Sequence, residues 1–385
     1  MAGESSPIEV PRARNRYDLK ELSGAFGDLG TLVPFVIAYL AIVKMDPGAV
    51  LLGFGGAMIA TGMWYRTPFP VQPMKAIGAA AATHAAGAAI TPAIVVGSGL
   101  VTAVFWLVLG ATGLAKKLAE WIPRPALLGV VLGLGFGFML EGIRMMSGAA
   151  WLSAALLALA LLAHSRLPTM LLLLAAGVAI ALFRQPALAA DLSAIVPEFR
   201  LPAFAWPALS ASDLWTGAIL LALPQLPLTF GNALLAITSE NNRLFPDRPV
   251  TERGVAISTG LVNAWSSALG GVPMCHGAGG MAGHVKFGAR TGGATVMAGV
   301  LLVLLALFFS GSMHVLLRLF PGPVLGVILF LAGAELALSS RESGDERVGR
   351  FVLLTTAAFT VVHVGVAVVF GILAFHASKR GWLRP

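Results

Sequence analysis

Two short stretches of the sequence place proline, glycine and hydrogen-bonding side chains inside otherwise apolar surroundings. Proline holds the residue before it in an extended conformation and suits the first turn of a helix. Each stretch therefore predicts a short extended lead followed by about half a helix, over 74–86 and 274–286. The residues of interest are Gln72, Pro73, Met74 and Lys75 in the first stretch and Met274, Cys275, His276 and Gly277 in the second.

A half-helix that begins in apolar surroundings is suited to bind an anion. Its first N–H groups have no partner within the helix, and the aligned peptide dipoles place about +0.5 charge at this end. Two such ends that face each other would make an anion site without a full cation. The glycines between 277 and 283 would let the backbone approach a ligand closely.

Lys75 and His276 each admit more than one role. Lys75 could support the anion electrostatically, form a salt bridge with Asp28 or Glu240, or extend toward the membrane surface. His276 could donate a hydrogen bond to the anion, carry a coupled proton, or be a packed structural histidine. Adjacent side chains on a helix diverge by about 100°, so Cys275 and His276 are not expected to form a catalytic pair.

Polar side chains also mark two other apolar segments. Asp28 and Thr31 are three residues apart, which predicts that they share one helix face. Gln225, Thr229 and Asn232 stand at i, i+4 and i+7 and form a stripe of neutral groups that could select a tetrahedral oxyanion by geometry. Hydrogen bonding between helices is the alternative role of this stripe. Because a carboxylate repels an anion, Asp28 is expected to carry a proton or pair with Lys75.

The composition identifies the surroundings of these groups as a membrane. Of 385 residues, 57% are hydrophobic and 11% are charged, and the mean hydropathy is +0.84. Soluble proteins carry about 25% charged residues, so a soluble globular fold, a disordered chain and a nucleic-acid binder are excluded. The single cysteine excludes an internal disulfide. The sequence has no metal-ligand cluster and no phosphate-binding loop, so no cofactor is expected.

Apolar runs follow one another along the chain and predict an all-α polytopic protein in contact with membrane lipid. A crossing helix needs about 20 residues. The two half-helices, and a split of the last run, 349–378, near His363, bring the number of segments to fourteen. The other segments lie near 24–43, 48–65, 92–113, 124–141, 150–164, 168–184, 213–238, 250–269, 291–310 and 322–340.

The basic residues favour one orientation in the membrane. With both termini in the cytoplasm, 20 of the 26 Lys and Arg residues fall in inside loops and five in outside loops. Positive charge gathers on the cytoplasmic side of membrane proteins. The sequence therefore predicts a cytoplasmic tail at 1–23, a cytoplasmic C-terminus at 379–385, and an external loop at 185–212, in an inner or plasma membrane.

Two pairs of similar motifs indicate an internal repeat. Pro73-Met74 and Pro273-Met274 lie 200 residues apart, and 123–132 resembles 321–329 at nearly the same offset. The chain is therefore expected to hold two repeats of seven segments, 24–184 and 213–378. An odd number inverts the second repeat in the membrane. Inverted repeats with paired broken helices are typical of secondary transporters that bind substrate at the midplane.

These motifs resemble signatures of the molybdate transporter family, which is related to the sulfate permeases. The matching stretches are 27–31, 70–76, 224–232 and 273–292. The resemblance implies a core domain and a gate domain with the substrate bound between them, and by analogy a homodimer. The core would comprise 24–113 and 213–310, and the gate 124–184 and 322–378. Because the chain ends at Pro385, the cytoplasmic regulatory domain of sulfate permeases is expected to be absent.

The expected function is molybdate import by alternating access, with coupling to a proton left open. Sulfate has the same charge and shape as molybdate, so a sulfate or general oxyanion transporter of the same fold is the alternative. An anion channel is a more distant alternative. An enzyme is not expected, because the sequence offers no convincing set of acid, base and nucleophile.

Overall fold

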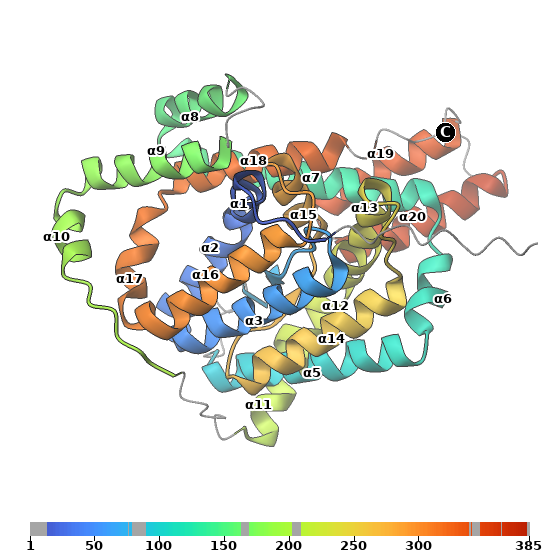
Figure 1. The fold of residues 1–385 in the computed structure, drawn as a ribbon. Helices are drawn as coiled ribbons and strands as arrows, with labels where there is room; N and C mark the ends of the chain where they lie inside the picture. The colour runs from blue at the N-terminus through green and yellow to red at the C-terminus, as the bar shows by residue number, and fades with distance from the viewer. Residues whose placement is uncertain are drawn as a thin grey trace, which may run out of the picture.

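The structure is a computed structural model that describes residues 14–75, 77–78, 90–162, 169–201, 209–338, 340, 347–362 and 364–382. The described part is mostly helical, as predicted, with one pair of very short strands (Figure 1). The helices are α1 Leu19–Ala25, α2 Leu29–Ala41, α3 Pro47–Tyr65, α5 Pro92–Ala111, α6 Leu114–Glu120, α7 Arg124–Ser147, α8 Ala150–Leu162, α9 Thr169–Arg184, α10 Ala187–Ser193, α11 Ala211–Thr216, η2 Gly217–Ala222, α12 Leu223–Phe230, η3 Gly231–Ala236, α13 Ile237–Leu244, α14 Glu252–Ala268, α15 Ala278–Lys286, α16 Gly293–Phe309, η4 Ser310–Ser312, α17 Met313–Leu316, η5 Leu317–Leu319, α18 Gly322–Leu338, α19 Arg347–Val362 and α20 Val364–Lys379.

Four helices, α3, α5, α14 and α16, lie side by side (Figure 1), with α3 packed along α16 and α5 along α14. Asp46 and Thr91 cap α3 and α5 through their side-chain oxygens, and a proline follows each cap in the first turn. Gly55 and Gly299 face each other where α3 crosses α16. A Cβ on either would lie 2.7 Å from the carbonyl oxygen of the other, so this close crossing depends on glycine at both positions.

A second group consists of α7, α18, α19 and α20. α7 packs along α18, and α19 and α20 pack on α7 and on each other. Gly142 of α7 and Gly326 of α18 face each other in the same way, again with 2.7 Å from an added Cβ to the opposite carbonyl oxygen. α19 ends at Val362 and α20 begins at Val364, and the predicted division near His363 falls on a residue outside the described part of the chain.

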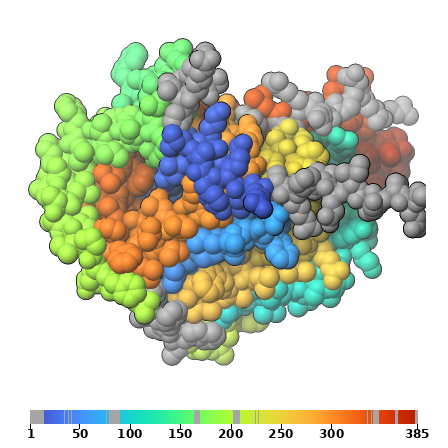
Figure 2. Space-filling model, in the orientation of Figure 1, coloured from blue at the N-terminus to red at the C-terminus, as the bar shows by residue number. Residues whose placement is uncertain are grey.

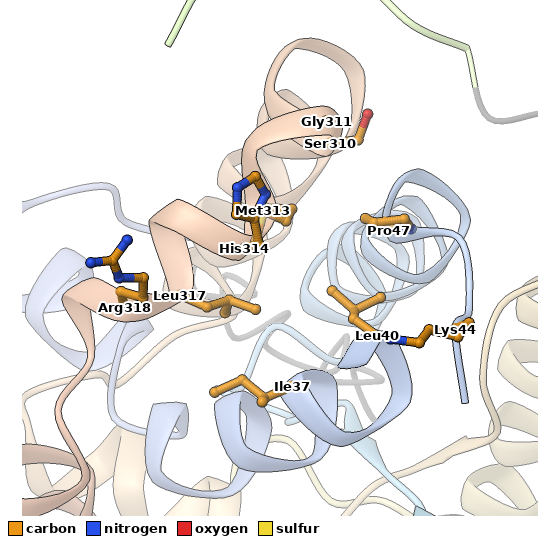
Figure 3. A pocket seen from close by; sticks show the side chains of 10 residues that line it. All are labelled: Ile37, Leu40, Lys44, Pro47, Ser310, Gly311, Met313, His314, Leu317 and Arg318. Carbon is orange, nitrogen blue, oxygen red and sulfur yellow. The ribbon is translucent and has the colours of Figure 1, made fainter. Parts of the chain in front are cut away.

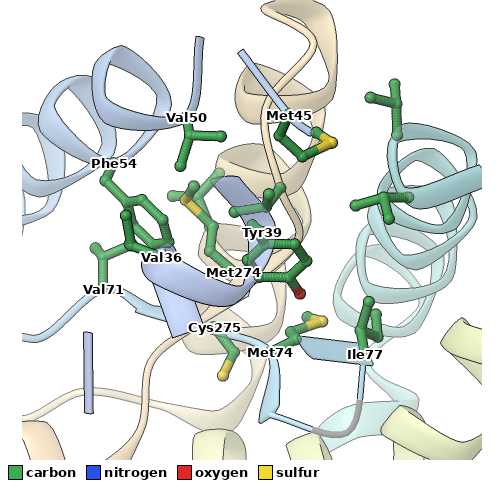
Figure 4. Close-up of a cluster of buried hydrophobic side chains, with 14 of the residues drawn as sticks. Val36, Tyr39, Met45, Val50, Phe54, Val71, Met74, Ile77, Met274 and Cys275 are labelled. Carbon is green, nitrogen blue, oxygen red and sulfur yellow. The ribbon is translucent and has the colours of Figure 1, made fainter. Parts of the chain in front are cut away.

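The strands β1 (Gln72–Pro73) and β2 (Met274–Cys275) pair antiparallel near α2 and α14. An apolar cluster buries them, and Figure 4 shows side chains of α2 and α3 packed around the two methionines of the strand region. Members of this cluster include Val36, Tyr39, Phe54, Val71, Met74, Met274 and Cys275. Since lipid is as apolar as these side chains, close packing rather than removal from water holds such a cluster together in a membrane.

Residues 211–244 form a helical run whose α-helical winding is interrupted twice. The π-helical segments η2 and η3 flank the short helix α12. Pro224 and Pro227 lie in α12 and lack the N–H groups that would continue the α-helical bonding. π-helical turns inside helices occur frequently at functional sites. In this chain they set the directions of the polar side chains that α12 and η3 carry.

The helices α8, α9 and α10 lie along one edge of the molecule and continue into an extended strap (Figure 2). In this strap Glu198 and Arg200 donate backbone N–H bonds to the carbonyls of Phe308 and Leu307, at 3.0 and 2.8 Å. Arg318 of η5 contacts Asp191 of α10 at 2.7 Å. These contacts tie the middle of the chain to the end of α16 and to the α17 region.

Large apolar side chains are exposed on the outer helices, as in a protein solvated by lipid. Trp64, Trp151 and Phe183 are 81%, 92% and 86% exposed. Four helical runs are long and apolar enough to cross a membrane, and a fifth is added if α9 and α10, bent by 112°, count as one. The four are Pro47–Tyr65, Pro92–Ala111, Arg124–Ser147 and Gly293–Leu319. Helix length in the described part thus supports an integral membrane protein, while the number fourteen stays a prediction.

Candidate functional site

The two broken segments meet in the middle of the fold. Gln72 lies opposite Cys275 and Pro73 opposite Met274 in the strand pair, and the N–H of Met74 donates to the carbonyl of Pro273 at 3.0 Å. The two Pro-Met motifs, 200 residues apart in sequence, are therefore direct neighbours. Each strand leads toward a helical turn, as the sequence predicted.

The two helical starts differ in how much of them is described. The second begins at Ala278 and runs as α15 to Lys286, with Gly277 as its N-cap. The first begins at Lys75 and is described at 77–78. The remainder of the predicted half-helix, Ala76 and 79–86, lies outside the described residues.

Side-chain amides of the predicted polar stripe cap both helical starts. The Oε1 atom of Gln225 accepts a hydrogen bond from the N–H of Ile77 at 3.4 Å. The Oδ1 atom of Asn232 accepts one from the N–H of Ala278 at 3.3 Å. Gln225 also donates from Nε2 to the hydroxyl of Thr229 at 2.9 Å. Gln225, Thr229 and Asn232 are nearly fully buried, so the stripe lies at the broken segments.

Asp28 and Thr31 join the first strand through Gln72. The Nε2 atom of Gln72 donates to Oδ1 of Asp28 at 2.6 Å and to Oγ1 of Thr31 at 2.7 Å, and the Thr31 hydroxyl also bonds to Asp28. Asp28 stands directly before α2, which begins at Leu29, and its carbonyl oxygen accepts from the N–H groups of Thr31 and Leu32 at 3.0 Å, so the two polar side chains lie on the same side of the first turn. The turn before α2 brings Gly27 against the backbone of Gly283, and this contact places Asp28 beside the first turn of α15.

The ammonium group of Lys75 lies over the ring of Phe138 in α7, with Nζ 3.6 Å from the ring centroid. This nitrogen is buried and has no hydrogen-bond partner among the described residues. Within the described part of the chain, Lys75 forms no ion pair with Asp28 or Glu240. Glu240 instead holds Arg243, one turn along α13, through two contacts of 2.8 and 3.1 Å. The structure therefore places Lys75 beside the strand pair and Glu240 in a separate ion pair.

His276 connects the two broken segments. Its Nδ1 lies 2.8 Å from the carbonyl oxygen of Pro70, and its Nε2 lies 2.8 Å from the hydroxyl of Ser258. Because a carbonyl oxygen only accepts, Nδ1 carries a proton, and in the neutral ring Nε2 accepts from Ser258. Both nitrogens are engaged, which favours the structural role among those that the sequence left open. Cys275 is buried in β2 as a free thiol.

Sequence reasoning missed three residues of this region. Asn263 of α14 bonds both backbone groups of Met274, donating to its carbonyl at 2.6 Å and accepting from its N–H at 3.0 Å. Ser258, also in α14, fixes His276, and Phe138 of α7 lies against Lys75. For α14 the sequence did offer a signal of an inward polar contact: polar residues within the segment, at Ser258, Thr259 and Asn263. No comparable signal marks Phe138 in its apolar run.

The arrangement suits a small anion. Two helical starts, one lysine and three neutral amides converge in a buried region, and the N-terminal ends of α-helices favour negative charge.

A cavity of about 590 Å³ opens elsewhere, between α2 and α17, beside Lys44, His314 and Arg318 (Figure 3). None of the predicted site residues lines it. Among the described residues, no cluster of three or more His, Cys, Asp or Glu side chains could hold a metal ion.

Comparison with known sequences gives consistent matches. The family described as "Molybdate transporter of MFS superfamily" matches residues 20–138 and 217–336. Molybdate transporter 2 of Arabidopsis thaliana is 31% identical over 414 residues, which cover 93% of this chain and 87% of the relative. Molybdate transporter 1 of Chlamydomonas reinhardtii is 30% identical and covers 91% of each chain.

Solved structures share the fold at low sequence identity. The transmembrane domain of the cyanobacterial bicarbonate transporter BicA aligns with a TM-score of 0.58 at 17% identity, over 92% of this chain and 97% of that domain. The inward-facing murine anion transporter Slc26a9 aligns with a TM-score of 0.62 at 12% identity, over 98% of this chain and 70% of that one. At these identities the likeness describes the fold alone.

Proposed function

The chain belongs to the molybdate transporter family, and from that premise we propose that it is a secondary transporter of a tetrahedral oxyanion, molybdate in the first place. The observation that carries the proposal is the pairing of two broken segments whose helical starts are capped by neutral side-chain amides, Gln225 and Asn232. Each capped N–H group is a donor that a dianion can use in place of the amide oxygen.

We assign the anion to the space at these two helical starts. Backbone N–H groups of the first turns, the amides of the stripe and the ammonium of Lys75 would bind it. Gln72 joins the site to Asp28 and Thr31. His276 and Asn263 hold the two strands in place and act through them. Glu240, which pairs with Arg243, is left out of the site.

Alternating access by two inverted repeats is the proposed mechanism. The two segments that match the family, 20–138 and 217–336, are almost equal in length and support an internal duplication. Two repeats related by a two-fold axis would show matching contacts. Such contacts are the packing of α3 on α16 and of α5 on α14, and the pairing of β1 with β2. In this proposal the group that contains α7 and α18 is the gate, and it moves against the core that carries the strands.

Proton coupling is proposed to act through Asp28. Its Oδ1 accepts from Gln72, and its Oδ2 has no hydrogen-bond partner among the described residues. An unprotonated carboxylate here repels a dianion, so a proton on Asp28 and an anion at the site favour each other.

The charge distribution of the loops supports cytoplasmic termini.

Sulfate is the second candidate substrate, because the proposed ligand groups discriminate poorly between anions of different radius. Backbone N–H groups and amides recognise the charge and shape that molybdate and sulfate share. The site as described contains no feature that sets an upper limit on the radius of the ion.

Uptake of labelled molybdate into proteoliposomes of the purified protein tests the proposal. Saturable uptake that persists in excess sulfate, and that an inward proton gradient accelerates, is the expected result. Equal or faster sulfate uptake would identify a general oxyanion permease. Anion current that does not saturate and does not depend on a proton gradient would identify a channel and overturn the transporter mechanism.

A further inference from the structure

Phe138 lies where the two broken segments and α7 meet. Its ring faces the ammonium of Lys75 at 3.6 Å. The same ring packs on the first turn of α15, since a Cβ added to Gly279 would lie 2.7 Å from two of its carbon atoms. From behind, Phe138 is supported by Gly333 of α18, where an added Cβ would lie 2.8 Å from the Cβ of Phe138. The side chain is 8% exposed.

The contact between Lys75 and Phe138 substitutes for an anionic partner. A buried ammonium with no hydrogen-bond partner is costly, and the negative face of an aromatic ring compensates part of that cost. Among the described residues, the Lys75 nitrogen has no hydrogen-bond partner, the Phe138 ring lies against it, and Asp28 and Cys275 interact with it electrostatically. A dianion at the helical starts would offer the same ammonium a stronger partner. The ring and the anion therefore compete for Lys75.

We propose that Phe138 is the residue through which occupancy of the anion site is communicated to α7: its ring holds Lys75 while the site is empty and is released when the anion takes Lys75. The inference rests on the proposed function, because it needs an anion at this site. In the empty site the ring links α7 to both helical starts. Binding of the anion removes the ammonium from that link and weakens the hold of α7 on the first helical start, while the contact of the ring with α15 at Gly279 remains.

The competition predicts that weakening the ring interaction strengthens anion binding. Phe138→Leu keeps an apolar side chain but removes the ring face. Molybdate should bind the variant more tightly, by a factor between about two and thirty, the range that cation–π energies span. Transport per protein should fall, because the empty and loaded sites no longer differ in their hold on α7. The measurement is calorimetric titration of the purified protein in nanodiscs with sodium molybdate, alongside proteoliposome uptake.

Two comparisons separate this effect from a general loss of packing. Phe136→Leu on the same helix is the matched control, since Phe136 is 47% exposed, and it should bind molybdate as the unchanged protein does. In a Lys75→Met background, Phe138→Leu should have no further effect on affinity, because the competition requires the ammonium. If Phe138→Leu does not fold, a ring-fluorinated phenylalanine at 138 weakens the ring face at nearly constant shape and should also tighten binding.

The outcomes distinguish the inference from the function on which it rests. If the unchanged protein binds neither molybdate nor sulfate, the proposed function fails. If it binds molybdate and Phe138→Leu leaves the affinity unchanged or weakens it, the proposed role of Phe138 is wrong. The same conclusion follows if the tightening persists in full without Lys75.

Discussion

The side-chain oxygen of Asn232 accepts a hydrogen bond from the N–H of Ala278, 3.3 Å away, and so caps α15 from another helix. Gly277, the N-cap residue of α15, has no side chain that could do this. Gln225 caps the turn at Ile77 in the same manner. A neutral oxygen thus stands where an anionic oxygen would be favoured more strongly, and the site keeps its donors satisfied without a fixed negative charge.

Replacement of Asn232 by Asp separates helix capping from anion binding. The carboxylate has nearly the same shape and caps α15 at least as well, so the melting temperature should stay equal or rise. Its charge should repel a dianion, and molybdate affinity should fall by about tenfold or more. Thermal unfolding and molybdate titration of the same sample measure both effects. Retained affinity in Asn232→Asp would place the anion away from the start of α15.

Replacement of Gln225 by Ala removes the cap at Ile77 and one amide of the stripe. Loss of one neutral hydrogen bond corresponds to about 1 kcal/mol, so uptake at low molybdate should fall roughly fivefold while membrane insertion is unchanged. Gln185→Ala is a suitable control, because Gln185 makes its contact with Arg318 at the exposed edge. Uptake by Gln225→Ala equal to that of the unchanged protein would remove the stripe from the site.

A bulky residue at position 277 should close the second helical start. A Cβ there would lie 2.9 Å from Cδ of Gln72 and 3.2 Å from Nδ2 of Asn232, so Gly277→Leu leaves no room for an anion between them. Molybdate binding should be lost. Gly148→Leu is the control, since an added Cβ at Gly148 has no described neighbour within 4 Å. Normal binding by Gly277→Leu would mean that the anion is held elsewhere.

The contacts of His276 predict a stability effect rather than a change in coupling. Ser258→Ala leaves Nε2 of His276 buried without its partner, which costs about 1–3 kcal/mol and should lower the melting temperature. Proton stimulation of uptake should persist in this variant and in His276→Gln. Loss of that stimulation in either variant would indicate that His276 carries the coupled proton.

The meeting of the two broken segments could be predicted from sequence, and their partners only in part. The Pro-Met motifs predicted extended leads, and the strand pair joins them. The spacing of Gln225, Thr229 and Asn232 predicted a polar stripe, because 3.6-residue periodicity is a local property. Side-chain hydrogen bonds from α14 to β2 depend on which face of α14 turns inward, and periodicity does not supply that information.

Residues whose role depends on tertiary contact alone escaped the sequence analysis. Phe138 is one aromatic residue in an apolar run, and its approach to Lys75 arises from the packing of α7. The start of α2 was misplaced for the same reason. The chain turns before Leu29 because Gly27 abuts Gly283 in a distant segment, and nothing local to 24–43 reports that contact.

Replacement of Asp28 by Asn tests the proposed coupling. Asp28 is buried, and the charged or titratable groups that interact with it are His284, Lys75 and Cys275. Protonation of Asp28 removes its repulsion of a dianion, so uptake by the unchanged protein should rise as the external pH falls. Asn resembles the protonated acid and can keep a bond with Gln72. Uptake by Asp28→Asn should therefore be independent of pH and insensitive to a proton gradient.

The control for this test is Glu141→Gln, since Glu141 pairs with Arg144 at an exposed site and should retain the pH dependence. Molybdate exchange across the membrane without a gradient should survive in Asp28→Asn, because the helical starts and their amide caps remain. If Asp28→Asn keeps the full proton stimulation, the proton is carried by another group. The residue to replace next is then His284. It donates from Nδ1 to the carbonyl of Gly24 at 2.7 Å, and its Nε2 is buried without a described hydrogen-bond partner.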